Sequence, residues 1–170
     1  LAGADNVEVT ETGNASFTGF GVKKILQPTK SMPDYNTVSD ADVVIMRYAH
    51  VLLMIAEAEN EVNGPTEKAL KAINAVRTRS HQPAIDGANL TQAELRERIR
   101  NEWRVETCFE GLRYFQLKRW KLLQQTVDGA VDPAYPAYKK VVTSAFEYFP
   151  LPQGEIDKAH GVLVQDPNYQ

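Results

Sequence analysis

The chain has 170 residues, about one domain's worth, and 43% of them are hydrophobic and 24% charged, which is an ordinary globular composition. The formal net charge of −3 and the isoelectric point of about 5.7 lack the basic excess that nucleic-acid-binding proteins usually carry. No apolar stretch approaches the roughly 20 residues that span a bilayer, and the single cysteine, Cys108, excludes an internal disulfide and a multi-cysteine zinc site.

Residues 1–42 are predicted to be irregular. Val7, Val9 and the stretch 22–26 alternate weakly, which favours a few short strands, while glycines and prolines divide the remainder into loops. Such a segment forms no compact core alone. The chain also starts at Leu1 with neither an initiator Met nor a leader, so we expect a fragment whose structure begins upstream.

Residues 43–62 give the clearest helical pattern. The apolar positions at helical spacing are Tyr48, Val51, Leu52, Ile55, Ala58 and Val62. Gly64 should end this helix in a left-handed conformation, and Pro65 should take the first position of the next helix. That second helix is predicted over residues 66–79.

Two further helices are predicted after a loop over residues 80–90. Thr91 and Glu94 have the spacing of a capping box, and the third helix should run from there to about Glu110. Gly111 interrupts the pattern, and a fourth helix should follow to about Gln124. A long connection comes next, and prolines should keep residues 146–152 extended.

Two helical hairpins in tandem indicate tetratricopeptide-like packing. The predicted fold is therefore mainly α, with tetratricopeptide-like hairpins, long irregular loops and a few short strands. Two hairpins are fewer than a solenoid normally needs, which again favours a missing upstream part.

Three segments, in order, resemble motifs of the SusD/RagB family. Residues 47–58 (RYAHVLLMIAEA) and 69–79 are similar to R-Y-A-E-v-L-L-m-y-A-E-A and A-x-x-x-I-N-x-V-R-x-R. Residues 99–120 are similar to I-R-x-E-R-R-x-E-l-x-F-E-G-x-R-y-x-D-L-k-R-W, with Trp103 in place of Arg and Gln116 in place of Asp. Residues 149–156 and 165–169 are similar to F-P-I-P-x-x-E-I and Q-N-P-G-Y.

The resemblance implies a binding protein at the cell surface. Members of this family sit on the outer face of the outer membrane, held by an N-terminal lipid anchor, over a SusC-like TonB-dependent transporter; here we expect that anchor to belong to the missing upstream part. They capture oligosaccharides, or in some branches oligopeptides, and deliver them to that channel. The implied organisation is an irregular segment over residues 1–42 and a C-terminal helical domain of this family over residues 43–170.

Carboxylates recur every four residues along the third predicted helix. A carboxylate pair could hydrolyse glycosides, but such pairs usually flank a substrate from different elements. Several arginines lie close to these carboxylates in sequence, which favours a structural ion-pair network between the hairpins. Its predicted members are Arg77, Arg79, Glu102, Glu106, Glu110 and Arg113.

Aromatic side chains are the candidates for ligand contact. Tyr35, Tyr135 and Tyr138 lie in predicted loops, where binding residues concentrate on a rigid scaffold. Trp103 could stack on a sugar ring, with core packing as the alternative. No metal-ligand pattern, phosphate loop or nucleophile motif occurs, and Cys108 is expected to be a buried thiol.

The predicted function is non-catalytic capture of glycan nutrients, without cofactor, metal or nucleic acid. Two alternatives stay open: an oligopeptide-binding member of the same family, and a tetratricopeptide-like scaffold that binds only protein. The scaffold alternative leaves the 149–152 segment and the Tyr169 ending unexplained.

Overall fold

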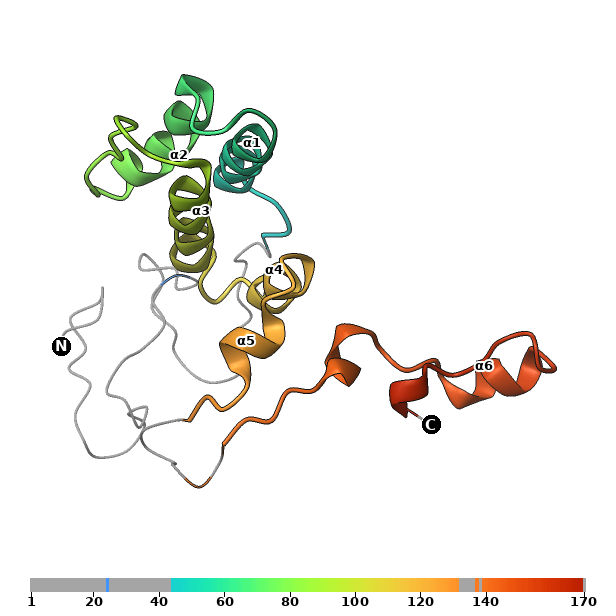
Figure 1. The fold of residues 1–170 in the computed structure, drawn as a ribbon. Coiled ribbons are helices and arrows are strands. Elements are labelled where there is room, and N and C mark those ends of the chain that lie inside the picture. The colour runs from blue at the N-terminus through green and yellow to red at the C-terminus, as the bar shows by residue number, and fades with distance from the viewer. Residues whose placement is uncertain (1–23, 25–43, 132–136, 138, 170) are drawn as a thin grey trace, which may run out of the picture. The chain divides into compact units, whose positions relative to one another are not determined.

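The computed structural model describes residues 24, 44–131, 137 and 139–169 (Figure 1). By its internal contacts the chain divides into two compact units, Leu1–Leu112 and Arg113–Gln170. This boundary falls inside the helical domain predicted over residues 43–170, whose bounds stay a prediction. The short strands predicted before residue 43 lie outside the described residues.

The first unit is built from helices α1 (Tyr48–Asn63), α2 (Glu67–Arg79) and α3 (Gln92–Glu106). Helix α1 lies against both α2 and α3 (Figure 1). Residues 64–66 join α1 to α2, and this short connection makes the two helices an antiparallel hairpin. The described residues are mainly helical, as the sequence predicts.

Helix α1 begins five residues later than predicted. Arg47 precedes it with an extended backbone (φ −139°, ψ 164°), and its N–H donates to Nδ1 of His50 at 3.4 Å. The apolar residues 43–46 favoured a helix in the prediction, but residues 44–46 are not helical.

The buried face of α1 differs from the predicted one. Tyr48 and Val62, which the prediction places on the apolar face, are 74% and 79% exposed. The helix instead turns its small residues inward, so that its backbone can approach α2 closely. The buried residues of α1 are Ala49, His50, Leu53, Ala56 and Asn60, and those of α2 are Ala69, Ala72, Ile73 and Val76.

The end of α1 is joined to the start of α3 by two amide side chains. Asn60 Nδ2 donates to the carbonyl of Gln92 at 3.0 Å, and Gln92 Nε2 donates to the carbonyl of Asn60 at 2.7 Å. A carbonyl oxygen has two lone pairs, so each of these carbonyls can accept a side-chain N–H besides a backbone one. This reciprocal pair fixes where the hairpin meets α3.

The N-terminal caps follow the sequence with one difference. Thr91 Oγ1 accepts from the Glu94 N–H at 3.2 Å, and Glu94 Oε2 accepts from the Thr91 N–H at 2.8 Å, so the predicted capping box is confirmed. Pro65 does not begin α2, because Thr66 is the N-cap and accepts from Ala69 N at 3.3 Å. The threonine hydroxyl accepts a hydrogen bond from a helix N–H, and proline has no side-chain acceptor that could do so.

Helix α3 ends at Glu106 instead of the predicted Glu110. Phe109 and Gly111 have φ values of +63° and +75°, which right-handed helix does not allow. Glu110 is therefore displaced from the helical row of Glu102 and Glu106.

The second unit contains α4 (Arg113–Arg119), α5 (Leu123–Val127) and α6 (Gln153–Lys158), with short 3-10 helices Ser144–Glu147 and Pro167–Tyr169. Lys121, with φ +57°, divides the predicted fourth helix into α4 and α5. Leu117, Leu123 and Val142 form the buried cluster. The prediction that residues 146–152 are extended is wrong at its start, since the first 3-10 helix includes Phe146.

The chain's ending pairs with the segment around Pro150. Gln165 Nε2 donates to the carbonyl of Leu151 at 2.9 Å, and Leu151 N–H donates to Gln165 Oε1 at 3.0 Å. The Tyr169 hydroxyl donates to the carbonyl of Tyr148 at 2.7 Å. The last two of the quoted motif segments, whose contacts span 14 residues of sequence, thus form one local structure.

Within the described part of the chain, no helix combines the length and the apolar character needed to cross a bilayer.

Replacing Gly64 by alanine should destabilise the protein by roughly 1–3 kcal/mol, because φ 80° with ψ −159° is a region that only glycine adopts readily. Nothing lies within 4 Å of the added Cβ, so the cost is one of backbone conformation. Urea unfolding of the wild type and the variant measures it. Gly154→Ala, also in open space but inside α6, is the control and should be neutral or slightly stabilising. Equal effects of the two substitutions would contradict this account.

Candidate functional site

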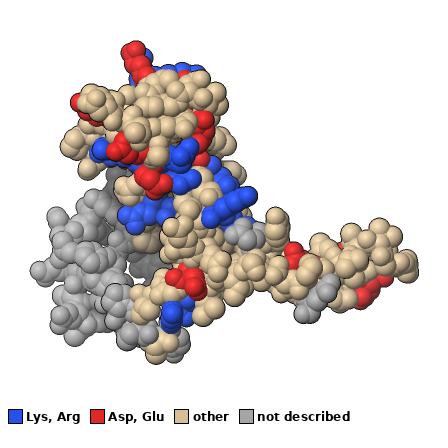
Figure 2. All heavy atoms as spheres, viewed as in Figure 1, with Lys and Arg blue, Asp and Glu red and all other residues tan. Residues whose placement is uncertain are grey.

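Three carboxylates form the charged centre of the first unit. Glu102 and Glu106 are buried on α3, and Glu110 follows the end of that helix. Charged side chains of both signs are interspersed on the face of the molecule shown in Figure 2. A buried carboxylate costs several kcal/mol unless cations and hydrogen bonds compensate it, so its partners decide what it can do.

Glu102 is held by Arg77 of α2. Nη1 of Arg77 lies 2.7 Å from Oε2 of Glu102, and Nε of Arg77 donates to the carbonyl of Pro83 at 2.8 Å. One guanidinium therefore ties together α2, the following loop and α3.

Glu106 is held by two arginines. Arg79 Nη2 lies 2.5 Å from its Oε1, and Arg47 Nη1 bonds to the same oxygen. Arg47 Nη2 also donates to the Glu106 backbone carbonyl at 2.7 Å. The start of α1 and the ends of α2 and α3 thus meet at one carboxylate.

Glu110 receives hydrogen bonds from three cationic or polar side chains. Arg47 Nη2 lies 2.8 Å and Lys24 Nζ 2.6 Å from its Oε1, and His50 Nε2 lies 2.7 Å from its Oε2. Burial alone would raise the pKa of Glu110, but the bonds from Arg47, Lys24 and His50 outweigh it and lower the pKa to about 2. Burial likewise opposes the charge on Arg47, yet its bonds to Glu110 and Glu106 raise the pKa of the guanidinium above its usual value.

The hydrogen bonds of His50 fix its tautomer. Its Nδ1 accepts the Arg47 N–H, so Nε2 carries the hydrogen that is donated to Glu110. The imidazole thus acts on both the N-terminus of α1 and the carboxylate beyond α3.

Lys24 caps the C-terminal end of α3. Its Nζ donates to the carbonyls of Glu106 at 2.6 Å and Cys108 at 3.1 Å, besides its contact with Glu110. The last carbonyls of a helix have no intrahelical donor and carry partial negative charge, so an ammonium group is favourable there.

The structure places the predicted network members in two groups. Arg77 pairs with Glu102 in the first group, and Arg79 pairs with Glu106 in the second. Glu110 contacts neither of these arginines; it shares Arg47 with Glu106. Arg113 starts α4 in the second unit, and its place relative to these groups is not described. The sequence reasoning missed Arg47, His50 and Lys24. The leading Arg of the first quoted motif could have pointed to Arg47, whereas nothing in the sequence singles out Lys24.

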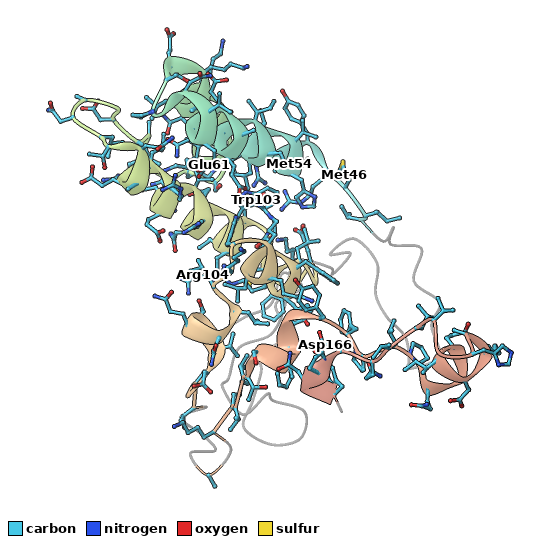
Figure 3. All side chains as sticks on the ribbon, turned by 45° about the vertical axis from the view of Figure 1, so that its right-hand side comes forward. Met46, Met54, Glu61, Trp103, Arg104 and Asp166 are labelled. Atoms are coloured by element: carbon cyan, nitrogen blue, oxygen red, sulfur yellow. The ribbon has the colours of Figure 1, made fainter. Side chains whose placement is uncertain are left out.

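The predicted ligand-contact residues are only partly placed. Tyr35, Tyr135 and Tyr138 lie outside the described residues. Trp103 lies on the side of α3 that faces α1, with its ring 6.0 Å from that of His50, and is 4% exposed (Figure 3). A buried ring offers no face to a sugar, so we assign Trp103 to the core, the alternative weighed above.

An open hollow lies on the other side of α3. Its volume is about 360 Å³, and it is lined by Arg77, Ile85, Glu97, Arg98 and Asn101. It draws on α2, the loop between α2 and α3, and the outer face of α3.

The geometry of the carboxylate cluster favours structural work over catalysis. Glu102, Glu106 and Glu110 each contact at least one cation, whereas a glycosidase pair flanks a substrate. Within the described ranges, no group of three or more potential metal ligands occurs. Cys108 is exposed instead of buried, because the chain leaves the helix before it.

Comparison with known families decides the identity of the chain. A model of the SusD family matches residues 4–169. The chain belongs to the SusD family. SusD-like protein P2 of Formosa agariphila is 30% identical over 140 residues, which are 77% of this chain and 26% of that protein. SusD-like protein P25 of the same organism is 40% identical over 86 residues, 49% of this chain and 16% of that protein.

Solved SusD-like structures share the helical arrangement. A SusD-like protein from Bacteroides fragilis superimposes with a TM-score of 0.64 at 28% identity, covering 76% of this chain and 26% of that one. Surface glycan-binding protein A from Bacteroides thetaiotaomicron gives a TM-score of 0.58 at 28% identity over 75% of this chain and 25% of that one. This chain therefore spans about a quarter of the length of these relatives, and its tetratricopeptide-like fold is that of the family.

The charged residues of the SusD motifs form ion pairs with one another in this chain. Arg47 opens the first motif, Arg77 and Arg79 close its continuation, and Glu102, Glu106 and Glu110 belong to the second. Through their contacts the motifs lock the helix ends of the first unit to one another.

Stability of this SusD-family protein should fall in acid through Glu110. Its folded pKa of about 2 lies below its usual 4.5, so its stabilisation is complete above about pH 4.5 and is lost as pH falls towards 2. The difference corresponds to about 2–3 kcal/mol after allowance for partial contact with water. Glu110→Gln should remove this pH-dependent part, measured by urea unfolding at pH 7 and pH 3.

Glu97→Gln is the matched control for this prediction, because Glu97 is an exposed glutamate of α3 that pairs with Arg100 at 2.8 Å. We expect it to change the free energy of unfolding by less than about 0.5 kcal/mol. If Glu110→Gln leaves the same acid sensitivity as the wild type, the pairing of Glu110 does not control it.

Proposed function

We propose that this chain is the helical part of a protein that binds glycan nutrients at the outer surface of the outer membrane and hands them to a SusC-like TonB-dependent transporter. The observation that supports it most is the likeness, over three quarters of the chain, to a surface glycan-binding protein. The lipid anchor that would hold the protein at the membrane belongs to the same proposal.

Binding without catalysis is the second part of the proposal. Proteins of the SusD family bind their ligands and do not transform them, and the acidic residues that could suggest hydrolysis are engaged here. Arg77, Arg79 and Arg47 hold Glu102 and Glu106 within the first unit. The carboxylates of a glycosidase flank the substrate, whereas these contact arginines of the neighbouring helices.

Capture and release also suit the way in which the first unit is built. Its helix ends are joined by guanidinium and amide groups, and a rigid scaffold of this kind keeps binding loops in place without itself moving. Oligopeptides remain the alternative cargo, and a protein partner the alternative ligand.

Calorimetric titration of the full-length protein with neutral and acidic oligosaccharides and with oligopeptides tests the proposal, with analysis of each mixture for products. We expect saturable binding of oligosaccharides and unchanged ligands, because the proposal includes no reactive group. Binding of oligopeptides but not of oligosaccharides would show that the protein is an oligopeptide-binding member of the family. A chemically altered ligand would overturn the non-catalytic part, and no binding to any ligand would favour the protein scaffold.

A further inference from the structure

The hollow on the outer side of α3 has the build of a small ligand site. Its volume of about 360 Å³ is at the lower end of the range for small-molecule sites, roughly 300–1,000 Å³, and suits one sugar unit. It does not overlap the charged centre, which faces the interior of the same unit, although Arg77 touches both.

The walls of the hollow are held in place by hydrogen bonds. Asn74 Nδ2 donates to the carbonyl of Ile85 at 3.0 Å, and Asn74 Oδ1 accepts from the Ile85 N–H at 2.7 Å. Arg77 fixes the same loop through the carbonyl of Pro83. Ile85, at 6% exposure, is thereby held as an apolar wall whose position does not depend on a ligand. Such a site loses little conformational entropy on binding.

Among the charged side chains that line the hollow, Arg77 and Glu97 have ion-pair partners, and Arg98 is the one to consider for a ligand. Glu102 compensates Arg77, and Arg100 compensates Glu97 at 2.8 Å. In the part of the chain that the structure describes, Arg98 is exposed and forms no salt bridge, and Glu94 influences it only through its charge. Among the described residues, no carboxylate holds the hydrogen-bond donors of Arg98, so its guanidinium at the hollow is open to a ligand.

Asn101 lies one helical turn beyond Arg98 on the same side of α3. Its Oδ1 accepts from Arg104 at 3.4 Å, which leaves the amide nitrogen to donate to a ligand. A guanidinium binds a carboxylate through two parallel hydrogen bonds, and an amide suits a hydroxyl group.

We propose that this hollow binds a uronate unit of an acidic glycan, with its carboxylate on Arg98 and a hydroxyl on Asn101. The proposal rests on the function proposed above and narrows its ligand class to carboxylated sugars. It also assigns ligand contacts to α3, at residues other than the Trp103 that the sequence suggested.

Calorimetry of the full-length protein with digalacturonate, and with galactobiose as the neutral counterpart, tests the site. Digalacturonate should bind more tightly than galactobiose, and Arg98→Gln should weaken digalacturonate at least about tenfold, since a charge-assisted pair is lost. Lys71→Gln, the same loss of charge at an exposed position of α2 outside the hollow, is the matched control and should change affinity less than about twofold. Methyl NMR should show the Ile85 resonance shifting during the titration.

Three outcomes would overturn the uronate site: galactobiose binding as tightly as digalacturonate, equal weakening by Arg98→Gln and Lys71→Gln, or an Ile85 signal that does not move. If neutral oligosaccharides still bind, the proposed function stands without this site. If no oligosaccharide binds, both fall together.

Discussion

The first unit depends on the guanidinium of Arg47. It reaches from the residue before α1 to two carboxylates, Glu106 at the end of α3 and Glu110 beyond it, and to the backbone carbonyl of Glu106. Each of these groups would be costly to bury alone, so the start of α1 and the end of α3 can only be placed together. The remaining contacts of the cluster, from His50 and Lys24, act on an arrangement that Arg47 has already fixed.

The cluster and the outer hollow use the two sides of α3 for different purposes. The inner side carries Glu102, Glu106 and Trp103, which bind α1 and α2 and keep the helix rigid. The outer side carries Arg98 and Asn101, which have room for a ligand. Arg77 connects the two, since it lines the hollow while paired to Glu102. The contacts on the inner side of α3 hold the helix in place, and they thereby fix the positions of the proposed binding residues on its outer side.

Local features of the fold could be predicted from the sequence and long-range ones could not. The capping box of Thr91 and Glu94 needs only residues three apart, so the sequence specifies it. The buried face of α1 could not be predicted from the sequence, because that helix has two apolar faces. The face that contains alanines is the buried one, since small residues let the helices pack more closely. Lys24 contacts a carbonyl 82 residues away, and no local pattern encodes such a contact. Helix ends were overestimated where a left-handed residue such as Phe109 or Lys121 stops the helix without a glycine or proline.

The stripe that α1 leaves uncovered has a practical consequence in water. Tyr48, Met54, Ile55 and Val62 are all more than one third exposed along this helix, and Ile45 and Met46, which precede it, are exposed as well. A continuous exposed apolar surface of this kind promotes nonspecific association between molecules at high concentration. The isolated chain should therefore be handled dilute, and apparent oligomers seen on a sizing column would reflect this surface before any specific assembly.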